Sequence, residues 1–139
     1  MDSNILGKAK ELEIAGTLIR NGVYVFQPLV DTGIDLIATN KQTSKFIPIQ
    51  VKYRAKDPSL NLFKRDIERF IHSKPVLAFI IGTEPNLKIW YIPFESWLSK
   101  AIDKNRNDNR VYVKIKENEV WLKQFESDLG LKSTFKDLL

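Results

Sequence analysis

The chain has 139 residues, of which 43% are hydrophobic and 28% charged, which is the size and composition of one globular domain with a buried core. It has no cysteine and one histidine, which excludes disulfides, thiolate nucleophiles, cysteine-based metal sites and a multi-histidine cage within one chain. The net charge is only +5, and the longest apolar run, Val76–Ile81, is far shorter than the roughly 20 residues needed to cross a bilayer, so we expect a soluble, cytoplasmic protein.

The first half of the chain predicts one helix and three strands. Helix formers run from Ser3, a candidate N-cap, to the Asn21-Gly22 pair that would end the helix. Apolar and β-branched residues then predict strands at Val23–Gln27, Ile34–Thr39 and Phe46–Arg54. The polar segment Asn40–Ser44 would join the last two strands as an antiparallel hairpin.

The second half predicts alternating helices and strands. Leu60–Ser73 has the spacing of an amphipathic helix with a basic polar face. The following pattern predicts strands at Val76–Ile81, Leu87–Ile92 and Val111–Ile115, and helices at Glu95–Lys104 and Glu119–Leu129. No repeat or linker interrupts the chain, so we expect a single domain over residues 1–139, an α/β sandwich built on a mixed central β-sheet flanked by helices.

The positive charge is concentrated in one region. Lys41–Lys74 contains nine Lys and Arg residues but three acids, a local net charge of +6. This excess indicates a surface that faces a polyanion, although a solvated basic face is the alternative interpretation.

The alternation in Phe46–Arg54 separates a core face from a polar face. Ile47, Ile49, Val51 and Tyr53 share the apolar face, whereas Pro48, Gln50, Lys52 and Arg54 share the other. Gln50 and Lys52 are costly to bury without partners. Hairpin pairing would bring Asp35, the only carboxylate of the preceding strand, close to both.

This arrangement resembles the PD-(D/E)XK nuclease superfamily. The superfamily places an Asp on one hairpin strand and an acid or amide, any residue and a lysine on the next, here Gly33-Ile34-Asp35 and Gln50-Val51-Lys52. Many members also have an N-terminal helix with a small residue, three positions and a glutamate, which is similar to Gly7-Lys8-Ala9-Lys10-Glu11. The resemblance covers about residues 7–54, and more loosely Ile92–Glu95. Gln50 replaces the usual acid, as in compact homing endonucleases of this fold.

The resemblance implies a restriction-endonuclease-like fold and a metal-dependent endonuclease that hydrolyses phosphodiester bonds in DNA. Its catalytic residues would be Glu11, Asp35, Gln50 and Lys52. Asp35, Gln50 and the carbonyl of Val51 would hold Mg²⁺, or Mn²⁺ as the alternative ion, with Glu11 acting directly or through a water. Lys52 would orient or deprotonate the attacking water and offset charge in the transition state.

The helix phase independently indicates which glutamate faces the site. Glu11 shares a face with Ala15 and Leu18, whereas Glu13 lies with the polar residues of the helix. An inward Glu11 beside Asp35 is repelled unless a cation lies between them, which favours a divalent metal.

The partners follow from the same hypothesis. Phosphate contacts are expected from the basic residues after the site, namely Arg54, Lys56, Lys64, Arg65 and Arg69. Cutting both strands of double-stranded DNA requires two sites, so we expect a homodimer or a larger symmetric assembly, with no membrane association. The biological setting, namely homing, restriction or junction resolution, stays open, as do the target sequence and the residues that read bases.

Two alternatives remain at this point. A module that keeps the nuclease fold but only binds nucleic acid or protein is the rival function, and RNA is a third possibility as substrate. Other conspicuous residues have structural interpretations. His72 would end a helix, and Trp90, Trp97 and Trp121 would pack in the core or at a subunit contact.

Overall fold

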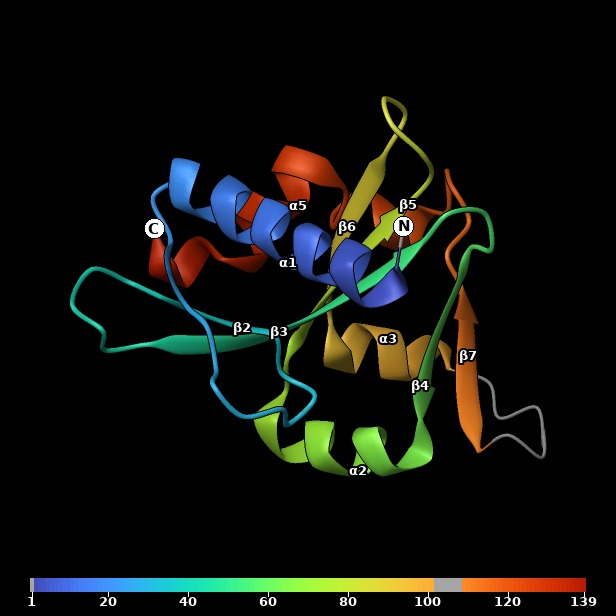
Figure 1. Cartoon of the computed structure of the whole chain (residues 1–139), viewed down its shortest axis with the longest axis horizontal. Helices are drawn as coiled ribbons and strands as arrows, with labels where there is room; N and C mark the ends of the chain where they lie inside the picture. Colours follow the sequence, from blue (N-terminus) through green and yellow to red (C-terminus); the bar gives the residue numbers. More distant parts are fainter. Residues whose placement is uncertain (1, 102–108) are drawn as a thin grey trace.

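A five-stranded mixed sheet forms the centre of the computed structural model, which describes residues 2–101 and 109–139 (Figure 1). Its strands, in spatial order, are β1 (Tyr24–Phe26), β2 (Leu36–Thr39), β3 (Phe46–Arg54), β5 (Val76–Ile81) and β6 (Lys88–Pro93). β3 and β5 run parallel, and the other neighbouring strands are antiparallel. The predicted hairpin, the predicted strands of this sheet and the mixed-sheet architecture are confirmed.

Helices and a second, small sheet surround the central one. The helices are α1 (Ser3–Arg20), α2 (Lys64–Ser73), α3 (Phe94–Lys100), α4 (Val120–Lys123), α5 (Ser127–Thr134) and the 3-10 turn η1 (Lys136–Leu138). β4 (Ser59–Phe63) and β7 (Arg110–Lys114) pair antiparallel outside the central sheet. None of the helices within the described ranges is both long enough and apolar enough to span a bilayer.

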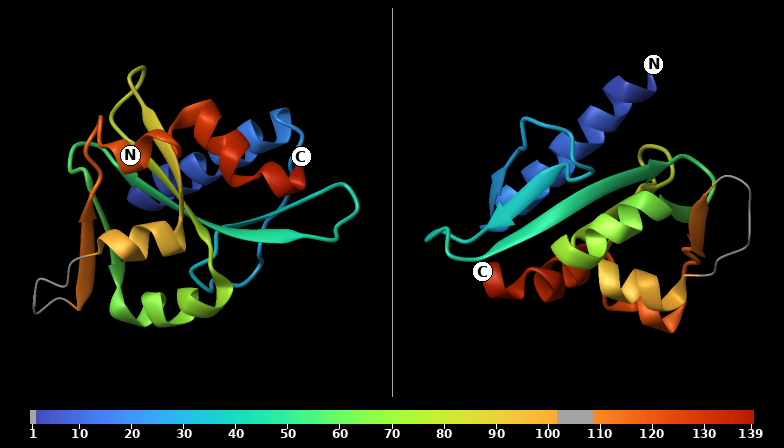
Figure 2. Two further views of the ribbon diagram at one scale, coloured as in Figure 1. Left: turned by 180° about the vertical axis from the view of Figure 1, so that it is seen from behind. Right: turned by 90° about the horizontal axis from the view of Figure 1, so that it is seen from below.

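The two faces of the central sheet each bury a hydrophobic cluster. Along β5, Leu77 and Phe79 join the cluster under α2, α3 and β4, whereas Ala78 and Ile80 join the one under α1 and α5. This follows from the period of two, which turns successive strand residues to opposite faces. Figure 2 shows α1 on one side of the β2–β3 hairpin and α2 and α3 on the other.

The prediction of a helix from Leu60 was wrong, because residues 59–63 form β4 and α2 begins only at Lys64. Leu60 and Leu62 point into the core, with Asn61 between them, which is the alternation of a strand. Their partners on β7, Val113 and Val111, lie about fifty residues further along the chain. A short apolar run followed by a true helix gives no local signal of such pairing.

The C-terminal helix predicted over Glu119–Leu129 is also wrong, because it is divided into α4 and α5. Between them the chain pairs with β6: the Tyr91 amide donates to the Phe125 carbonyl, and Glu126 bridges Trp90. Ser127 then has a positive φ of 52°. Tertiary pairing with a sheet edge therefore overrides the helical pattern.

Three predicted boundaries also shift. Asp2, not Ser3, caps α1, because its carboxylate accepts from the Asn4 amide at 2.7 Å. β2 begins at Leu36, which leaves Asp35 in the segment before the strand. α3 ends at Lys100, since Ala101 is extended, and the predicted remainder of that helix to Lys104 lies outside the described residues.

Candidate active site

Asp35 lies beside β3 at the point where the pairing of β3 with β2 ends. Its amide donates to the Ile49 carbonyl at 2.9 Å, and β2 pairs with the part of β3 that precedes Gln50. The Val51 amide, which has no strand partner on that side, donates instead to Asp35 Oδ2 at 2.7 Å. The carboxylate thus replaces a backbone acceptor at this edge, and this fixes its position beside Gln50 and Lys52.

A cavity of about 370 Å³ opens beside this part of β3. It is bordered by the start of α1, by the segment before β2, by β3 and by α2, so distant parts of the sequence meet there. Its lining includes all four predicted catalytic residues, Glu11, Asp35, Gln50 and Lys52, together with Val51. The predicted convergence of these side chains on one cavity is therefore present in the structure.

Gln50 is the most informative residue of the cavity wall. The residue is 6% exposed, yet its Oε1 has no hydrogen-bond partner in the described part of the chain. A buried carbonyl oxygen without a partner is costly, by about 1–3 kcal/mol. The oxygen is therefore free to accept a ligand that enters the cavity.

Glu11 faces the cavity, as the helix phase predicts. Its side chain is 18% exposed, and Oε2 lies 2.8 Å from Nζ of Lys8, an ion pair that raises the pKa of Lys8. Glu13, by contrast, has a half-exposed side chain. Glu11, and not Glu13, is therefore the carboxylate of this helix that lines the cavity.

The electrostatics of the cavity favour a bound cation. Burial and the nearby Glu11 carboxylate raise the pKa of Asp35 to about 7, although the hydrogen bond from Val51 opposes this. Burial, followed by the positive charge of Arg54, lowers the pKa of Lys52. The pKa of each group is thus shifted in the direction that favours its neutral form, which is typical of residues that act on a ligand.

The donor set fits a hard divalent cation. No group of three or more His, Cys, Asp or Glu side chains that could hold a metal occurs within residues 2–101 and 109–139. The cavity lining instead includes the carboxylates of Glu11, Asp31, Asp35 and Asp66, together with Gln50, whose Oε1 has no partner, and the main chain of Val51. All of these offer oxygen donors of the kind that Mg²⁺ and Mn²⁺ accept.

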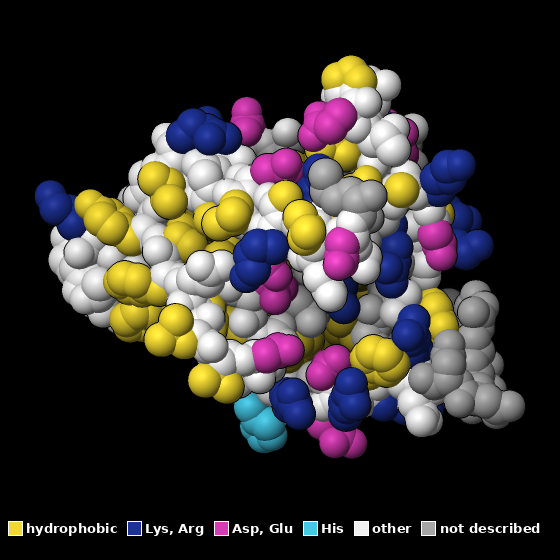
Figure 3. All heavy atoms as spheres, viewed as in Figure 1, with side chains coloured by type: hydrophobic (Ala, Val, Ile, Leu, Met, Phe, Trp, Pro, Cys, Tyr) yellow, Lys and Arg dark blue, Asp and Glu magenta, His cyan; other side chains and the backbone are white. Residues whose placement is uncertain are grey.

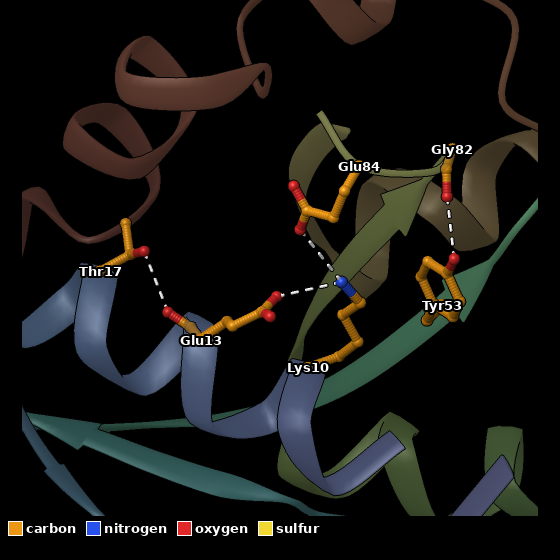
Figure 4. A network of polar contacts seen from close by, with 6 residues as sticks. All are labelled: Lys10, Glu13, Thr17, Tyr53, Gly82 and Glu84. Carbon is orange, nitrogen blue, oxygen red and sulfur yellow. Dashed lines mark hydrogen bonds and ion pairs between the residues drawn. The ribbon is translucent and has the colours of Figure 1, made fainter. Parts of the chain in front are cut away.

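Lys10 is a cavity residue that the sequence analysis missed. It is a charged residue of the helix, yet it is only 4% exposed. Its Nζ lies 3.2 Å from Glu13 Oε2, 3.6 Å from Glu84 Oε1 and 5.0 Å from the centre of the Tyr53 ring (Figure 4). Tyr53 in turn donates to the Gly82 carbonyl at 2.9 Å. The network joins α1 to β3 and to the β5–β6 turn.

The predicted phosphate-binding residues divide into two groups. Arg65 and Arg69 line the cavity, and Arg69 lies 3.9 Å from Asp66. Arg54, Lys56 and Lys64 do not line the cavity. Arg54 is the last residue of β3 and is partly buried, whereas Lys56 and Lys64 are exposed.

Phe63 and Arg110 were also missed. Phe63 lines the cavity, and the guanidinium groups of Arg65 and Arg110 lie 5.0 and 4.5 Å from the centre of its ring. The positive charge of Arg110 also contributes to lowering the pKa of Lys52. Only the pairing of β4 with β7 brings Arg110 here, so no local sequence signal could have identified it.

The remaining conspicuous residues have structural positions. His72 is exposed in the last turn of α2. Trp90 and Trp97 are buried in the core, as predicted, and Trp121 packs against its edge. The Asn- and Arg-rich sequence of Lys104–Arg110 is compatible with either a groove-probing loop or an inert one, and the segment lies outside the described residues except for its last two positions.

Comparisons with known proteins agree with this geometry. The family model described as Restriction endonuclease (Mrr_cat_2) matches residues 26–119, more than half of the chain and a range that includes Asp35, Gln50 and Lys52. The structure resembles Hjc, a Holliday junction resolvase from the archaeal hyperthermophile Archaeoglobus fulgidus, with a TM-score of 0.56 and 18% identity over 78% of this chain and 83% of that chain. At that identity the likeness shows a shared fold. No curated protein matches the chain.

Proposed function

Because the chain belongs to the restriction endonuclease family, it is a metal-dependent DNA endonuclease, and we propose that Glu11, Asp35, Gln50 and Lys52 form its active site. The resemblance to PD-(D/E)XK nucleases is thereby confirmed at the level of family and fold. The observation that carries the assignment of residues is the buried, unpartnered Oε1 of Gln50, a residue that lines the same cavity as Asp35 and Glu11. It supports Gln50 as a ligand in place of the usual acid.

The metal would be Mg²⁺, with Mn²⁺ as an alternative. Asp35, Gln50 and the Val51 carbonyl would hold it, and Glu11 would contribute directly or through a water. When bound, such an ion polarises a phosphate oxygen and lowers the pKa of a coordinated water. The neighbouring positive charge would also lower the pKa of Asp35, which burial and the Glu11 carboxylate raise.

Lys52 would act on the attacking water. Its pKa is lowered by burial and by Arg54, so its amine is closer to the neutral form than an exposed lysine. In that form it orients the water and accepts a proton from it. As an ammonium it stabilises the charge that accumulates on the phosphate in the transition state.

The basic side chains around the cavity would hold the DNA backbone. Arg65 and Arg69 line the cavity itself, and Arg54, Lys56 and Lys64 extend the positive surface from it. Such contacts position a duplex without reading its sequence. One site per chain cleaves one strand at a time, so we propose a homodimer or a larger symmetric assembly for cutting both strands.

The family name favours linear duplex DNA as the substrate, within a restriction role. The fold shared with Hjc makes a four-way DNA junction the second substrate to test. Comparing the cleavage rates of these two substrates distinguishes the roles, and a homing role requires a long, rarely occurring target sequence.

The test replaces Lys52 with Ala and measures plasmid nicking with Mg²⁺, with Mn²⁺ and with EDTA. We expect metal-dependent nicking by the wild type and a loss of at least about a hundredfold in the variant, which removes a group acting in the transition state. Lys132→Ala, an exposed substitution on α5, is the matched control and should cleave normally.

Binding measurements separate this function from that of a non-cleaving module. Lys52→Ala should still bind DNA in a gel-shift assay, and calorimetric titration with Ca²⁺ should detect an ion that Asp35→Asn no longer binds. A variant at Lys52 that cleaves like the wild type contradicts the proposed role. A wild type that neither cleaves nor binds a divalent ion would leave the binding module as the function.

A further inference from the structure

β7 presents a row of polar and basic side chains on the face opposite the core. Val111 and Val113 are buried in the same cluster as Leu60 and Leu62 of β4. Because strand residues alternate between faces, Arg110, Tyr112 and Lys114 lie together on the other face, and Lys114 is exposed.

One end of this row reaches the catalytic cavity. Arg110 is paired in register with Phe63, and its guanidinium lies 4.5 Å from the centre of the Phe63 ring. Phe63 itself lines the cavity and carries Arg65 on its ring. The row therefore begins beside the cavity in which the scissile phosphate would be bound.

The other end of the row leads to a second pocket, of about 270 Å³, that the nuclease site does not use. Three lysines line it, Lys100, Lys114 and Lys116, against one acid, Glu119. The Glu119 carboxylate accepts a hydrogen bond from Trp121 Nε1 at 2.7 Å, and Lys100 lies over the Trp121 ring. Lys114 and Lys116 have no acidic partner within the part of the chain that the structure describes.

The spacing of the row matches a nucleic-acid backbone. Side chains on one face of a strand are about 6.6 Å apart, so Arg110 and Lys114 are separated by about 13 Å. That length corresponds to the axial rise of about four phosphates along one strand of B-DNA. Figure 3 shows Lys and Arg side chains gathered along the side of the molecule where β4 and β7 lie.

We propose that the outward face of β7 and the pocket around Lys114 and Lys116 form a second DNA-backbone site, which holds the duplex where it leaves the catalytic cavity. The inference rests on the proposed function, because it takes the scissile phosphate to be in the cavity bordered by Phe63. The proposed site extends the DNA-binding surface beyond Arg54–Arg69 to β7, which lies outside the basic region Lys41–Lys74 of the sequence.

The experiment compares two double variants of equal charge. Lys114→Gln with Lys116→Gln removes two cations from the pocket, whereas Lys132→Gln with Lys136→Gln removes two exposed cations from α5 and the turn after it. The Kd for a fluorescent duplex is measured by anisotropy in EDTA over a range of salt concentrations. We expect the pocket variant to bind about tenfold more weakly at low salt and to lower the slope of log K against log salt by about two.

Two further measurements show whether weaker DNA binding has another cause, such as a loss of stability. Thermal melting should give the same Tm for both variants and the wild type, since the substituted side chains are exposed. At DNA concentrations below saturation the pocket variant should cleave more slowly than the control variant, because it binds the duplex more weakly. Binding is measured without metal, so its result stands even if the wild type proves unable to cleave.

A pocket variant whose Kd and salt slope equal those of the control variant would overturn the inference. Equal weakening by both double variants would also overturn it, because the loss would then follow from net charge and not from position.

Discussion

Asp35 connects the chemistry of the cavity to the stability of the fold. Its pKa is raised to about 7 by burial and by Glu11, whereas an unfolded chain has an Asp pKa of about 3.9. Between these values the folded state binds more protons than the unfolded state. In the absence of metal, the contribution of Asp35 to stability is therefore greatest below about pH 4 and is lost as the pH rises to about 7.

The Asp35→Asn variant tests the direction of this pH dependence of stability. The amide stays neutral and can still accept from the Val51 amide, so the metal-free variant should exceed the wild type in stability at pH 8 and match it near pH 4.5. The full shift corresponds to about 4 kcal/mol, and partial exposure of the side chain reduces the expected gain to about 1–2 kcal/mol. Urea unfolding in EDTA at both pH values measures it. A variant less stable than the wild type at pH 8 would contradict the effect.

Lys10 is expected to act as a positioning residue. Lys10→Met keeps the aliphatic stem but removes the ammonium that joins Glu13, Glu84 and the Tyr53 ring. Both glutamates are well exposed, so stability should change by no more than about 1 kcal/mol. Because Glu11 is the next residue on α1, the single-turnover cleavage rate at saturating DNA should fall by about tenfold.

The control for Lys10 is the DNA affinity of the same variant. It should equal that of the wild type when measured in EDTA. A weaker Kd with an unchanged rate at saturation would identify Lys10 as a phosphate contact, contrary to this prediction.

The sequence predicted which side chains meet in the cavity, but it did not predict what surrounds them. That Glu11, Asp35, Gln50 and Lys52 line one cavity could be expected because helix phase and strand alternation fix where side chains point. Lys10 could not, because its burial depends on Tyr53 of β3 and on the turn after β5, which are distant in sequence.

The corner between α4 and α5 depends on a glycine. A Cβ added at Gly130 would overlap the Phe125 carbonyl, which accepts the hydrogen bond from the Tyr91 amide on β6. Gly130→Ala should therefore displace this pairing and lower the free energy of unfolding by about 2–4 kcal/mol.

Gly7→Ala is the matched control in urea unfolding. An added Cβ there meets no atom within 4 Å, and alanine favours the helix, so stability should be unchanged or higher by up to about 1 kcal/mol. Equal stability of the two variants would show that the α4–α5 corner tolerates a side chain.

Elements formed by local patterns were predictable, and elements formed by distant pairing were not. α1, the β2–β3 hairpin and β5 follow from periodicity and turn residues within one stretch of chain. β4 needs β7 as its partner, and the break after α4 needs the edge of β6. In both cases the partner strand is too distant in the sequence to contribute to a local pattern.

Each chain has one proposed active site, and this determines the order in which its cleavage products should form. If two copies must act to cut both strands, nicked circles should precede linear plasmid, and the linear fraction should fall as the protein is diluted. Gel analysis of time courses over a hundredfold range of concentration, together with sedimentation of the protein, checks this. A constant ratio of linear to nicked product from a monomeric protein would contradict it.

Val51 takes part in the proposed site through its main chain alone, since its amide donates a hydrogen bond to Asp35. The proposed site uses only main-chain groups of this residue, an amide toward the carboxylate and a carbonyl toward the ion, while its isopropyl group packs against the cluster under α1. Exchanges among branched aliphatic residues there should therefore be accepted freely. The two flanking positions, whose side chains carry the reactivity, should tolerate almost none.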